Sequence, residues 1–185
     1  VTPDSFSDGG KHGDPQAAID AGFAMATEGA AIVDVGGEST RPGAPLVWEG
    51  DEIKRVEPVI AALAKGGVAT SVDTRKAAVM EAALAAGASL INDISALRYD
   101  ERALAVVAAA TCPVVLMHAP SAKSDPHEGG TYAQPLFDVY DLLAARIAAC
   151  EAAGIARTRI IVDPGIGFGK GVADNLALLN GLALF

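Results

Sequence analysis

The sequence is poor in the residues that build disulfide frameworks and zinc sites. Its two cysteines, Cys112 and Cys150, stand far apart, and its three histidines, His12, His118 and His127, share no metal-ligand spacing. So few cysteines are typical of a protein kept in a reducing compartment. The sequence therefore predicts a cytoplasmic protein without a disulfide framework or a zinc site.

Long apolar runs and an excess of positive charge are also missing. No run approaches the roughly 18 apolar residues of a membrane span, and the N-terminal VTPDSF has no signal-peptide character. The net charge is -9, which argues against nucleic acid as a general partner. Apolar residues make up 51% of the 185 residues, which suits a globular enzyme, so we expect one domain over residues 1–185.

The two ends of the sequence have unusual features. The chain starts at Val1 without Met, directly in a turn-rich segment, and it stops at Phe185 inside the apolar stretch LALLNGLALF. Both ends look cut, and we expect the sequence to be a fragment of a longer chain.

A repeated unit of apolar run, polar residue, loop and helical pattern organises the chain. Five runs have the near-continuous apolar character of strands buried on both faces of a parallel sheet: AAIVDV (30–35), ATSVDT (69–74), SLINDI (89–94), PVVLMH (113–118) and RIIVDP (159–164). Helical patterns fall at residues 15–28, 48–65, 75–86, 100–110, 135–153 and 174–182. Alternating strands and helices predict an α/β fold.

Two α/β architectures fit this order: a doubly wound sheet and a (β/α)8 TIM barrel. The G-x-G-x-x-G fingerprint is missing after the first run, and the glycine-rich stretch 165–171 does not match the Walker phosphate loop. Polar residues instead end all five runs: Asp34, Asp73, Asn92 with Asp93, His118 and Asp163. Barrel active sites are built at the C-terminal ends of strands, so the pattern favours a barrel. Because a complete barrel needs about 250 residues, we expect an incomplete one, about strands two to six with their helices.

Each of these polar residues also has a structural explanation. An Asp after a strand often forms a turn or caps a helix, and a lone histidine such as His118 is more often structural. Turn-forming residues need not all fall at the same end of the strands, however. The presence of polar residues at the same end of all five runs therefore favours a functional site.

Five motifs connect the sequence to a known family: VTPDSFSDGG (1–10), VDVGGESTRPGA (33–44), SVDT (71–74), INDI (91–94) and DPGIGFGK (163–170). In these motifs, and over its full length, the chain resembles the bacterial dihydropteroate synthase family. The resemblance implies that family's (β/α)8 barrel and its transferase reaction in folate biosynthesis. That reaction joins 6-hydroxymethyl-7,8-dihydropterin diphosphate to 4-aminobenzoate and gives 7,8-dihydropteroate and diphosphate. The resemblance also implies Mg²⁺ as cofactor, a homodimer, and a family that sulfonamides target.

The family's pterin-binding positions match the strand ends of this sequence, and the residue types suit the task. The carboxylates of Asp73 and Asp163 can accept paired N–H bonds from the edge of the heterocycle, and Asn92 offers both a donor and an acceptor. Met117 matches a residue that lines the pterin slot, although core filling explains it equally well. Asp34 matches a position near the pterin and diphosphate, with a supporting electrostatic role.

The loop that contains ESTRPG would bind the diphosphate and help to shape the aminobenzoate site. Arg41 offers a planar fork for two diphosphate oxygens, and Thr40 adds a hydroxyl and a backbone amide. By resemblance, the apolar contacts of the benzoate ring are Phe6, Pro42 and Phe168. Arg41 and Asp73 are the catalytic candidates, because Asp73 can stabilise the pterin methylene cation that remains when the diphosphate leaves.

Three polar residues within these motifs are expected to be structural and not to contact the substrates. Glu38 and Ser39 would hold the ESTRPG loop, and Lys170 would support the DPGIGFGK loop.

Some family positions fall outside the sequence. An Asn that binds Mg²⁺ would precede Val1, and a Lys and an Arg-x-His would follow Phe185, so no metal ligand is predicted within the chain. We expect the isolated 185-residue chain to be inactive. Two alternatives stay open: a methyltetrahydrofolate-dependent methyltransferase of the same pterin-binding family, which has no need of ESTRPG, and a non-catalytic partial barrel that at most binds pterin.

Overall fold

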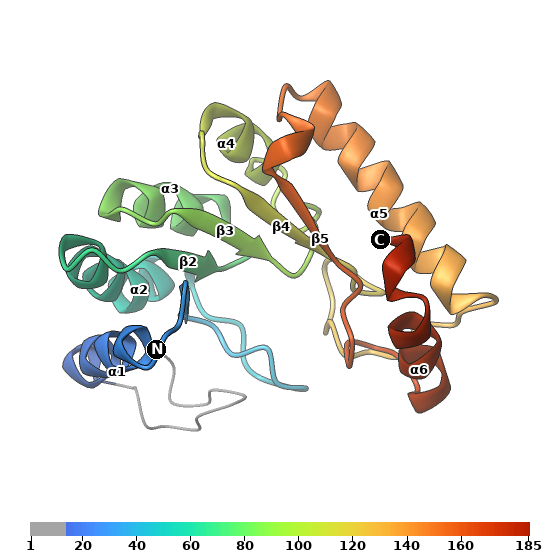
Figure 1. Cartoon of the computed structure of the whole chain (residues 1–185), viewed down its shortest axis with the longest axis horizontal. Helices are drawn as coiled ribbons and strands as arrows, with labels where there is room; N and C mark the ends of the chain where they lie inside the picture. The colour runs from blue at the N-terminus through green and yellow to red at the C-terminus, as the bar shows by residue number, and fades with distance from the viewer. Residues whose placement is uncertain (1–13) are drawn as a thin grey trace. The chain divides into compact units, whose positions relative to one another are not determined.

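The computed structural model describes residues 14–185, which divide into two compact units, residues 14–92 and 93–185 (Figure 1). Phe6 and the rest of the first motif lie outside the described residues. Each unit alternates strands and helices, and each is described by itself.

The first unit contains three parallel strands and three helices. Its elements are α1 (Pro15–Thr27), β1 (Val33–Gly36), α2 (Glu49–Lys65), β2 (Thr70–Asp73), α3 (Ala77–Ala86) and β3 (Leu90–Asp93), whose last residue begins the second unit. Strand β2 pairs in parallel with β1 on one side and β3 on the other. The three helices lie side by side in sequence order (Figure 1).

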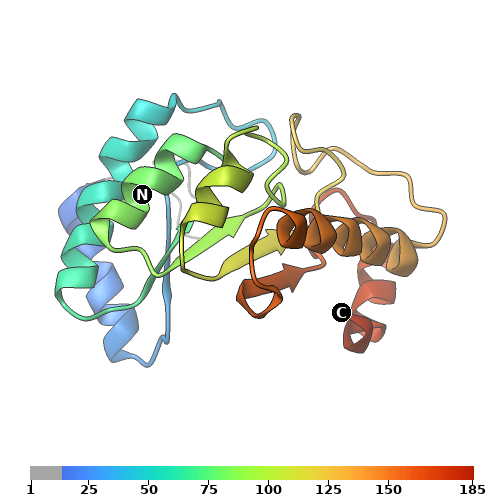
Figure 2. The same cartoon turned by 90° about the horizontal axis from the view of Figure 1, so that it is seen from above.

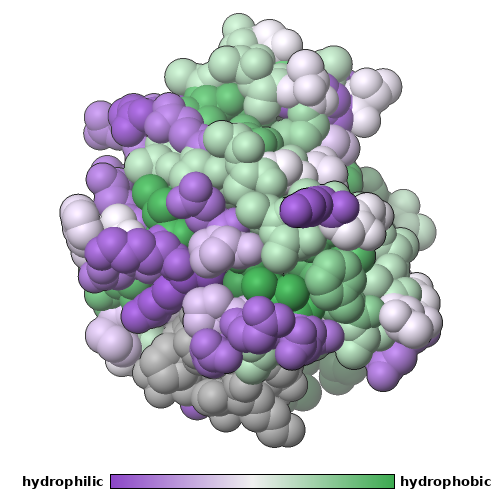
Figure 3. Space-filling model, turned by 90° about the vertical axis from the view of Figure 1, so that its left-hand side faces the viewer, coloured by the Kyte–Doolittle hydropathy of each residue, from purple (hydrophilic) through white to green (hydrophobic). Residues whose placement is uncertain are grey.

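Helix α2 supplies much of the first core, because its apolar residues recur at helical spacing. Val56, Val59, Ile60 and Leu63 are all 2% exposed or less. Gly22 of α1 allows a close approach to this stripe, since a Cβ there would lie 2.7 Å from Leu63 Cδ1. Figure 3 views the molecule from the side where α1, α2 and α3 lie. Hydrophilic and hydrophobic residues are mixed on that surface, as is usual for helices facing water.

The second unit pairs two parallel strands and covers them with helices. Its elements are α4 (Ala103–Ala109), β4 (Val114–Met117), α5 (Pro135–Ala152), a 3-10 turn (Arg157–Arg159), β5 (Ile160–Asp163), α6 (Val172–Asn180) and a second 3-10 turn (Leu182–Leu184). The register runs from Val114 opposite Ile160 to Met117 opposite Asp163. Figure 2 shows α5 beside this pair of strands, and the core between them includes Leu116 and Leu143.

The structure confirms the α/β class and every predicted strand and helix, with ends that differ by a few residues. Within residues 14–185, no helix combines the length and apolar character that crossing a membrane requires.

Candidate functional site

The polar residues at the ends of β1, β2 and β3 share one face of the strands. Alternate residues of a strand point to the same face, and the register sets Asp34 opposite Ser71 and Asp73 opposite both Gly36 and Asn92. The opposite face carries the buried apolar residues that pack under the helices. The structure therefore brings three predicted site residues, Asp34, Asp73 and Asn92, to one edge of the first unit.

Hydrogen bonds fix the Asp34 carboxylate within this group. The Asn92 amide donates to Asp34 Oδ2 at 3.1 Å, and the Ser71 hydroxyl donates to Asp34 Oδ1. Gly36 keeps the space beside Asp73 open, since a Cβ there would lie 3.5 Å from Asp73 Oδ2. Oriented carboxylate and amide groups are suited to reading the donor and acceptor edge of a heterocycle.

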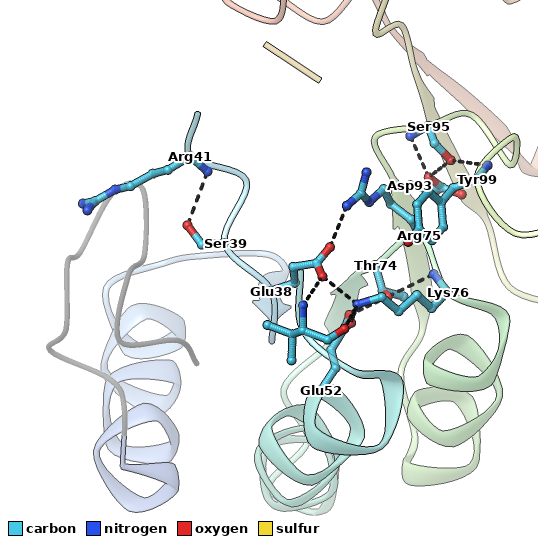
Figure 4. Close-up of polar contacts among 11 residues, drawn as sticks. Glu38, Ser39, Arg41, Glu52, Thr74, Arg75, Lys76, Asp93, Ser95 and Tyr99 are labelled. Atoms are coloured by element: carbon cyan, nitrogen blue, oxygen red, sulfur yellow. Dashed lines mark hydrogen bonds and ion pairs between the residues drawn. The ribbon is translucent and has the colours of Figure 1, made fainter. Parts of the chain in front are cut away.

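The loop after β1 presents the predicted diphosphate contacts at its tip. The backbone N–H of Ala44 bonds Arg41 O at 3.0 Å, and Gly43 has φ +72°, so residues 41–44 form a turn with Pro42 and Gly43 at its centre. Arg41 is exposed and points away from the buried polar cluster in Figure 4. Its backbone N–H donates to Ser39 Oγ at 3.3 Å. Among residues 14–185, the Arg41 guanidinium has no hydrogen-bond or ion-pair partner. The neighbouring Thr40 is half-buried.

Beneath this tip lies a buried cluster of charged residues (Figure 4). Lys76 Nζ donates to Glu38 Oε2 at 2.7 Å and to Glu52 Oε2, and Arg75 donates to Glu38 Oε1 at 2.8 Å. The Thr74 hydroxyl donates to Glu52 Oε1 at 2.6 Å. Burial alone would raise the pKa of Glu38, but the hydrogen bonds from Lys76, Arg75 and Val47 outweigh it and lower the pKa below its usual value.

Glu38 thus holds the loop, as the sequence predicted. The sequence analysis missed its side-chain partners Arg75 and Lys76. The one signal for these partners in the sequence was that two cationic residues, Arg75 and Lys76, stand directly after the buried run 69–74.

In the second unit, Asp163 and Met117 are neighbours across β4 and β5. Asp163 is half-buried, and its Oδ1 accepts a hydrogen bond from the Gly165 N–H at 2.7 Å. Met117 is 4% exposed and packs with Ile94 and Ala119. Each residue therefore has a structural contact beside its predicted role in binding.

Phe168 is held between two groups within the second unit. On one side it packs against the apolar cluster that contains Met117. On the other, the His127 ring stacks on it with centroids 4.6 Å apart, and His127 Nδ1 lies 3.3 Å from Gly167 O. The predicted benzoate contact is thus fixed by a histidine that the sequence analysis did not connect with it.

The DPGIGFGK loop is shaped by backbone contacts. Gly165 has φ +69°, and a Cβ there would lie 2.0 Å from the carbonyl oxygen of His118. Lys170 Nζ donates to the carbonyls of Gly165, Phe168 and His118 at 2.7, 3.0 and 3.3 Å. Burial lowers the pKa of Lys170 to about 8, although Asp163 favours its charged form. Lys170 therefore has the structural role that the sequence predicted.

His118 is a buried polar residue with an unsatisfied ring nitrogen. Its side chain is 3% exposed, and Nδ1 has no hydrogen-bond partner among the described residues. Burial, together with the nearby charge of Lys170, lowers the pKa of His118 to about 4. His118 is therefore neutral at pH 7, in agreement with the structural explanation given to a lone histidine.

No metal-binding cluster is found in the part of the chain that the structure describes. Residues 14–185 contain no group of three or more His, Cys, Asp or Glu side chains that could hold an ion. Since Mg²⁺ is usually held by one or two side chains together with substrate phosphates, it needs no such cluster, and no chemical step is assigned to the metal.

Several known proteins are similar to this chain in sequence and in structure. The dihydropteroate synthase of Bacillus subtilis is 45% identical over 186 residues, which is 100% of this chain and 63% of that protein. The structure of Xanthomonas albilineans dihydropteroate synthase with 4-aminobenzoic acid has a TM-score of 0.87 and 49% identity, covering 98% of this chain and 64% of that one. Burkholderia cenocepacia dihydropteroate synthase complexed with 7,8-dihydropteroate has a TM-score of 0.84 and 45% identity, covering 91% and 60%.

The chain thus spans 60–64% of the length of these three proteins. Similarity at this level confirms the predicted fold class, an incomplete (β/α)8 barrel to which the chain contributes five parallel strands. The family described as pterin binding enzyme matches residues 1–185. The chain belongs to the pterin binding enzyme family.

Proposed function

We propose that the whole protein is a dihydropteroate synthase, a transferase that joins 6-hydroxymethyl-7,8-dihydropterin diphosphate to 4-aminobenzoate. The relatives that bind 4-aminobenzoic acid and 7,8-dihydropteroate support this choice of substrates. The observation that carries the proposal is the group of Asp34, Asp73 and Asn92 on one face of the strand ends.

The pterin would be recognised by hydrogen bonds to its polar edge. In the first unit, Asp73 accepts N–H bonds from the ring, and Asn92 donates and accepts. In the second unit, Asp163 has the same task as Asp73, and Met117 contacts the flat face of the ring. Asp34, held by Ser71 and Asn92, acts on the pterin through its charge.

The diphosphate and the aminobenzoate would be bound by loop residues. Arg41 binds the diphosphate oxygens through its fork of N–H groups, and Thr40 adds a hydroxyl donor. Pro42, Phe168 and Phe6 contact the benzoate ring, and His127 keeps Phe168 in place by stacking.

The reaction would proceed by departure of the leaving group before attack. The bond between the pterin methylene carbon and the diphosphate oxygen breaks, and its electron pair leaves with the diphosphate, whose charge Arg41 stabilises. The negative charge of Asp73 stabilises the methylene cation that remains. The neutral amine of 4-aminobenzoate then forms the new C–N bond and loses a proton.

Some features of the whole protein are proposed on the sequence and the family resemblance alone. These are Mg²⁺ as cofactor, a homodimer, a cytoplasmic location and a single pterin-binding domain over residues 1–185. None of the residue roles above depends on them.

The proposal is tested by measuring dihydropteroate and diphosphate formation from the two substrates by the whole protein. We expect equal amounts of both products, and we expect Asp73→Asn to lower kcat by roughly 100-fold or more, since it removes charge stabilisation. Asp51→Asn is the matched control, because Asp51 is exposed on α2. Absence of dihydropteroate, with methyl transfer from methyltetrahydrofolate instead, would assign the protein to the methyltransferases of the family.

A further inference from the structure

Lys76 connects both ends of the loop that carries Arg41 to the rest of the first unit. It stands immediately before α3, and its ammonium group has three N–H donors. One donor bonds Glu38 Oε2 at 2.7 Å at the start of the loop, and a second bonds Val47 O at 2.7 Å at its end. The third bonds Glu52 Oε2 on α2. All three donors are used, and we call these four residues the Lys76 junction.

The Lys76 junction is buried and balanced in charge. Lys76 is 7% exposed and Glu52 is 1% exposed, and Arg75 adds a second cation beside Glu38. Removing the ammonium would leave two buried carboxylates with Arg75 as their remaining cation in this cluster. An uncompensated buried charge is strongly unfavourable, so the loop ends would have to rearrange.

The contacts hold the base of the loop and leave its tip exposed. Glu38 Oε2 also accepts the Val47 N–H at 2.9 Å, which closes the loop across nine positions. Gly37 has no room for a side chain, since a Cβ would lie 2.8 Å from Glu52 Cγ, and Arg55 bonds its carbonyl at 2.8 Å. Arg41, by contrast, is exposed at the tip, and Figure 4 shows its side chain pointing away from the junction.

We propose that Lys76 is a positioning residue that holds the two ends of this loop together, so that Thr40 and Arg41 are presented to the diphosphate of the substrate. The inference rests on the proposed function. A loop closed at its base loses less conformational freedom when its tip binds a ligand, which favours binding. Lys76 therefore acts on the diphosphate substrate through Arg41 and has no effect on a pterin without diphosphate.

The test is a double-mutant cycle of Lys76→Met and Arg41→Ala in the whole protein. We expect Lys76→Met to raise KM for the pterin diphosphate by roughly tenfold, but to add little in the Arg41→Ala background, because residues that act together are not additive. Affinity for a pterin without diphosphate, measured by calorimetry, should match the wild type and also reports on folding. Lys65→Met is the control, since Lys65 is exposed at the end of α2. Additive effects, or unchanged kinetics in Lys76→Met, would overturn the proposal.

Hydrogen exchange provides a second readout that does not depend on activity. Lys76→Met should speed exchange at the amides of residues 38–47, including the Val47 N–H that Glu38 accepts. Glu38→Gln, which keeps the shape of the side chain, should give the same change if Lys76→Met does not fold. A wild-type protein that makes no dihydropteroate contradicts the proposed function alone, whereas unchanged exchange in both variants contradicts the positioning role.

Discussion

Asp163 is the residue whose predicted role in binding most needs to be separated from its role in structure. Its carboxylate accepts the Gly165 N–H at 2.7 Å and is proposed to bind the pterin. We expect Asp163→Ala to abolish binding of a pterin analogue in calorimetric titration while unfolding remains cooperative. Asp163→Asn is the matched variant, because its amide oxygen can still accept from Gly165 but the charge is lost. Retained affinity in Asp163→Ala would remove this residue from the site.

Arg41 should discriminate between ligands with and without diphosphate. Its guanidinium is exposed and has no partner among the described residues, so its removal should have little effect on folding. We expect Arg41→Ala to weaken the diphosphate substrate by about 1.5–3 kcal/mol, the value of a hydrogen bond to a charged group, and to leave a bare pterin unaffected. Competition binding with both ligands measures this. Arg157→Ala removes another exposed arginine and serves as control. Equal losses for both ligands would contradict the diphosphate role.

Single residues were predictable where a local rule applies. Asp34, Asp73 and Asn92 each end a short apolar run, and parallel strands bring such ends to one edge, so their grouping followed from the sequence. The partners of Glu38 were not predictable in this way. Lys76 is 38 positions away, and although the pairing of β1 with β2 brings the segments after both strands close together, the course of each segment decides which side chains meet.

Whole elements were predicted well because apolar periodicity and helix-breaking glycines agree along this chain. Differences occur where side chains bond the backbone at helix ends. Helix α4 begins at Ala103, later than predicted, since Asp100 Oδ1 accepts the Arg102 N–H at 2.8 Å in a turn. Helix α6 begins earlier than predicted, because Asp174 accepts the Gly171 N–H at 2.9 Å and caps the first turn.

The turn after β3 has a conformation that no sequence rule indicated. Ala96 and Leu97 both have positive φ, 53° and 58°, which is unfavourable for residues with a Cβ. Asp93 Oδ2 accepts the Leu97 N–H at 3.1 Å, and Arg146 of α5 donates to Ala96 O at 2.9 Å. Contacts from a distant helix thus stabilise this turn, and local propensity could not reveal them.

The DPGIGFGK loop allows a prediction that separates backbone strain from steric clash. Gly165 and Gly167 both have positive φ, +69° and +85°, but a Cβ would collide with His118 O only at Gly165. We expect Gly167→Ala to lower the free energy of unfolding by about 1–2 kcal/mol, the cost of the left-handed conformation. Gly165→Ala should lower it further, because the carbonyl of His118 must also move. Chemical denaturation of both variants measures the difference, and equal losses would show that the clash is relieved without cost.

At the scale of the molecule, the class of fold was predictable but its division was not. Repetition of strand and helix along the chain indicates parallel β/α architecture. The sequence gives no composition shift near residue 92, where the structure divides into two compact units, because that division reflects how densely distant segments contact one another. The single domain over residues 1–185 therefore stays a prediction.

The pH dependence of stability is the last expectation, and it follows from the burial of His118. Its pKa is about 4 in the folded state and 6.5 in an unfolded chain, so between these values the unfolded chain binds a proton that the folded protein does not. The free energy of unfolding should therefore fall as pH drops from 6.5 to about 4, by up to about 3 kcal/mol at about 1.36 kcal/mol per pKa unit. From about pH 4.5 downward Glu38 adds a further loss, because its pKa is lowered in the folded state and the unfolded chain takes up the proton first. Denaturation of the whole protein at a series of pH values measures the slope, and His118→Gln should flatten it between pH 6.5 and 4. A buried neutral histidine must contribute to this slope. If His118→Gln leaves the slope between pH 6.5 and 4 unchanged, other groups cause the loss of stability and the expectation for His118 is wrong.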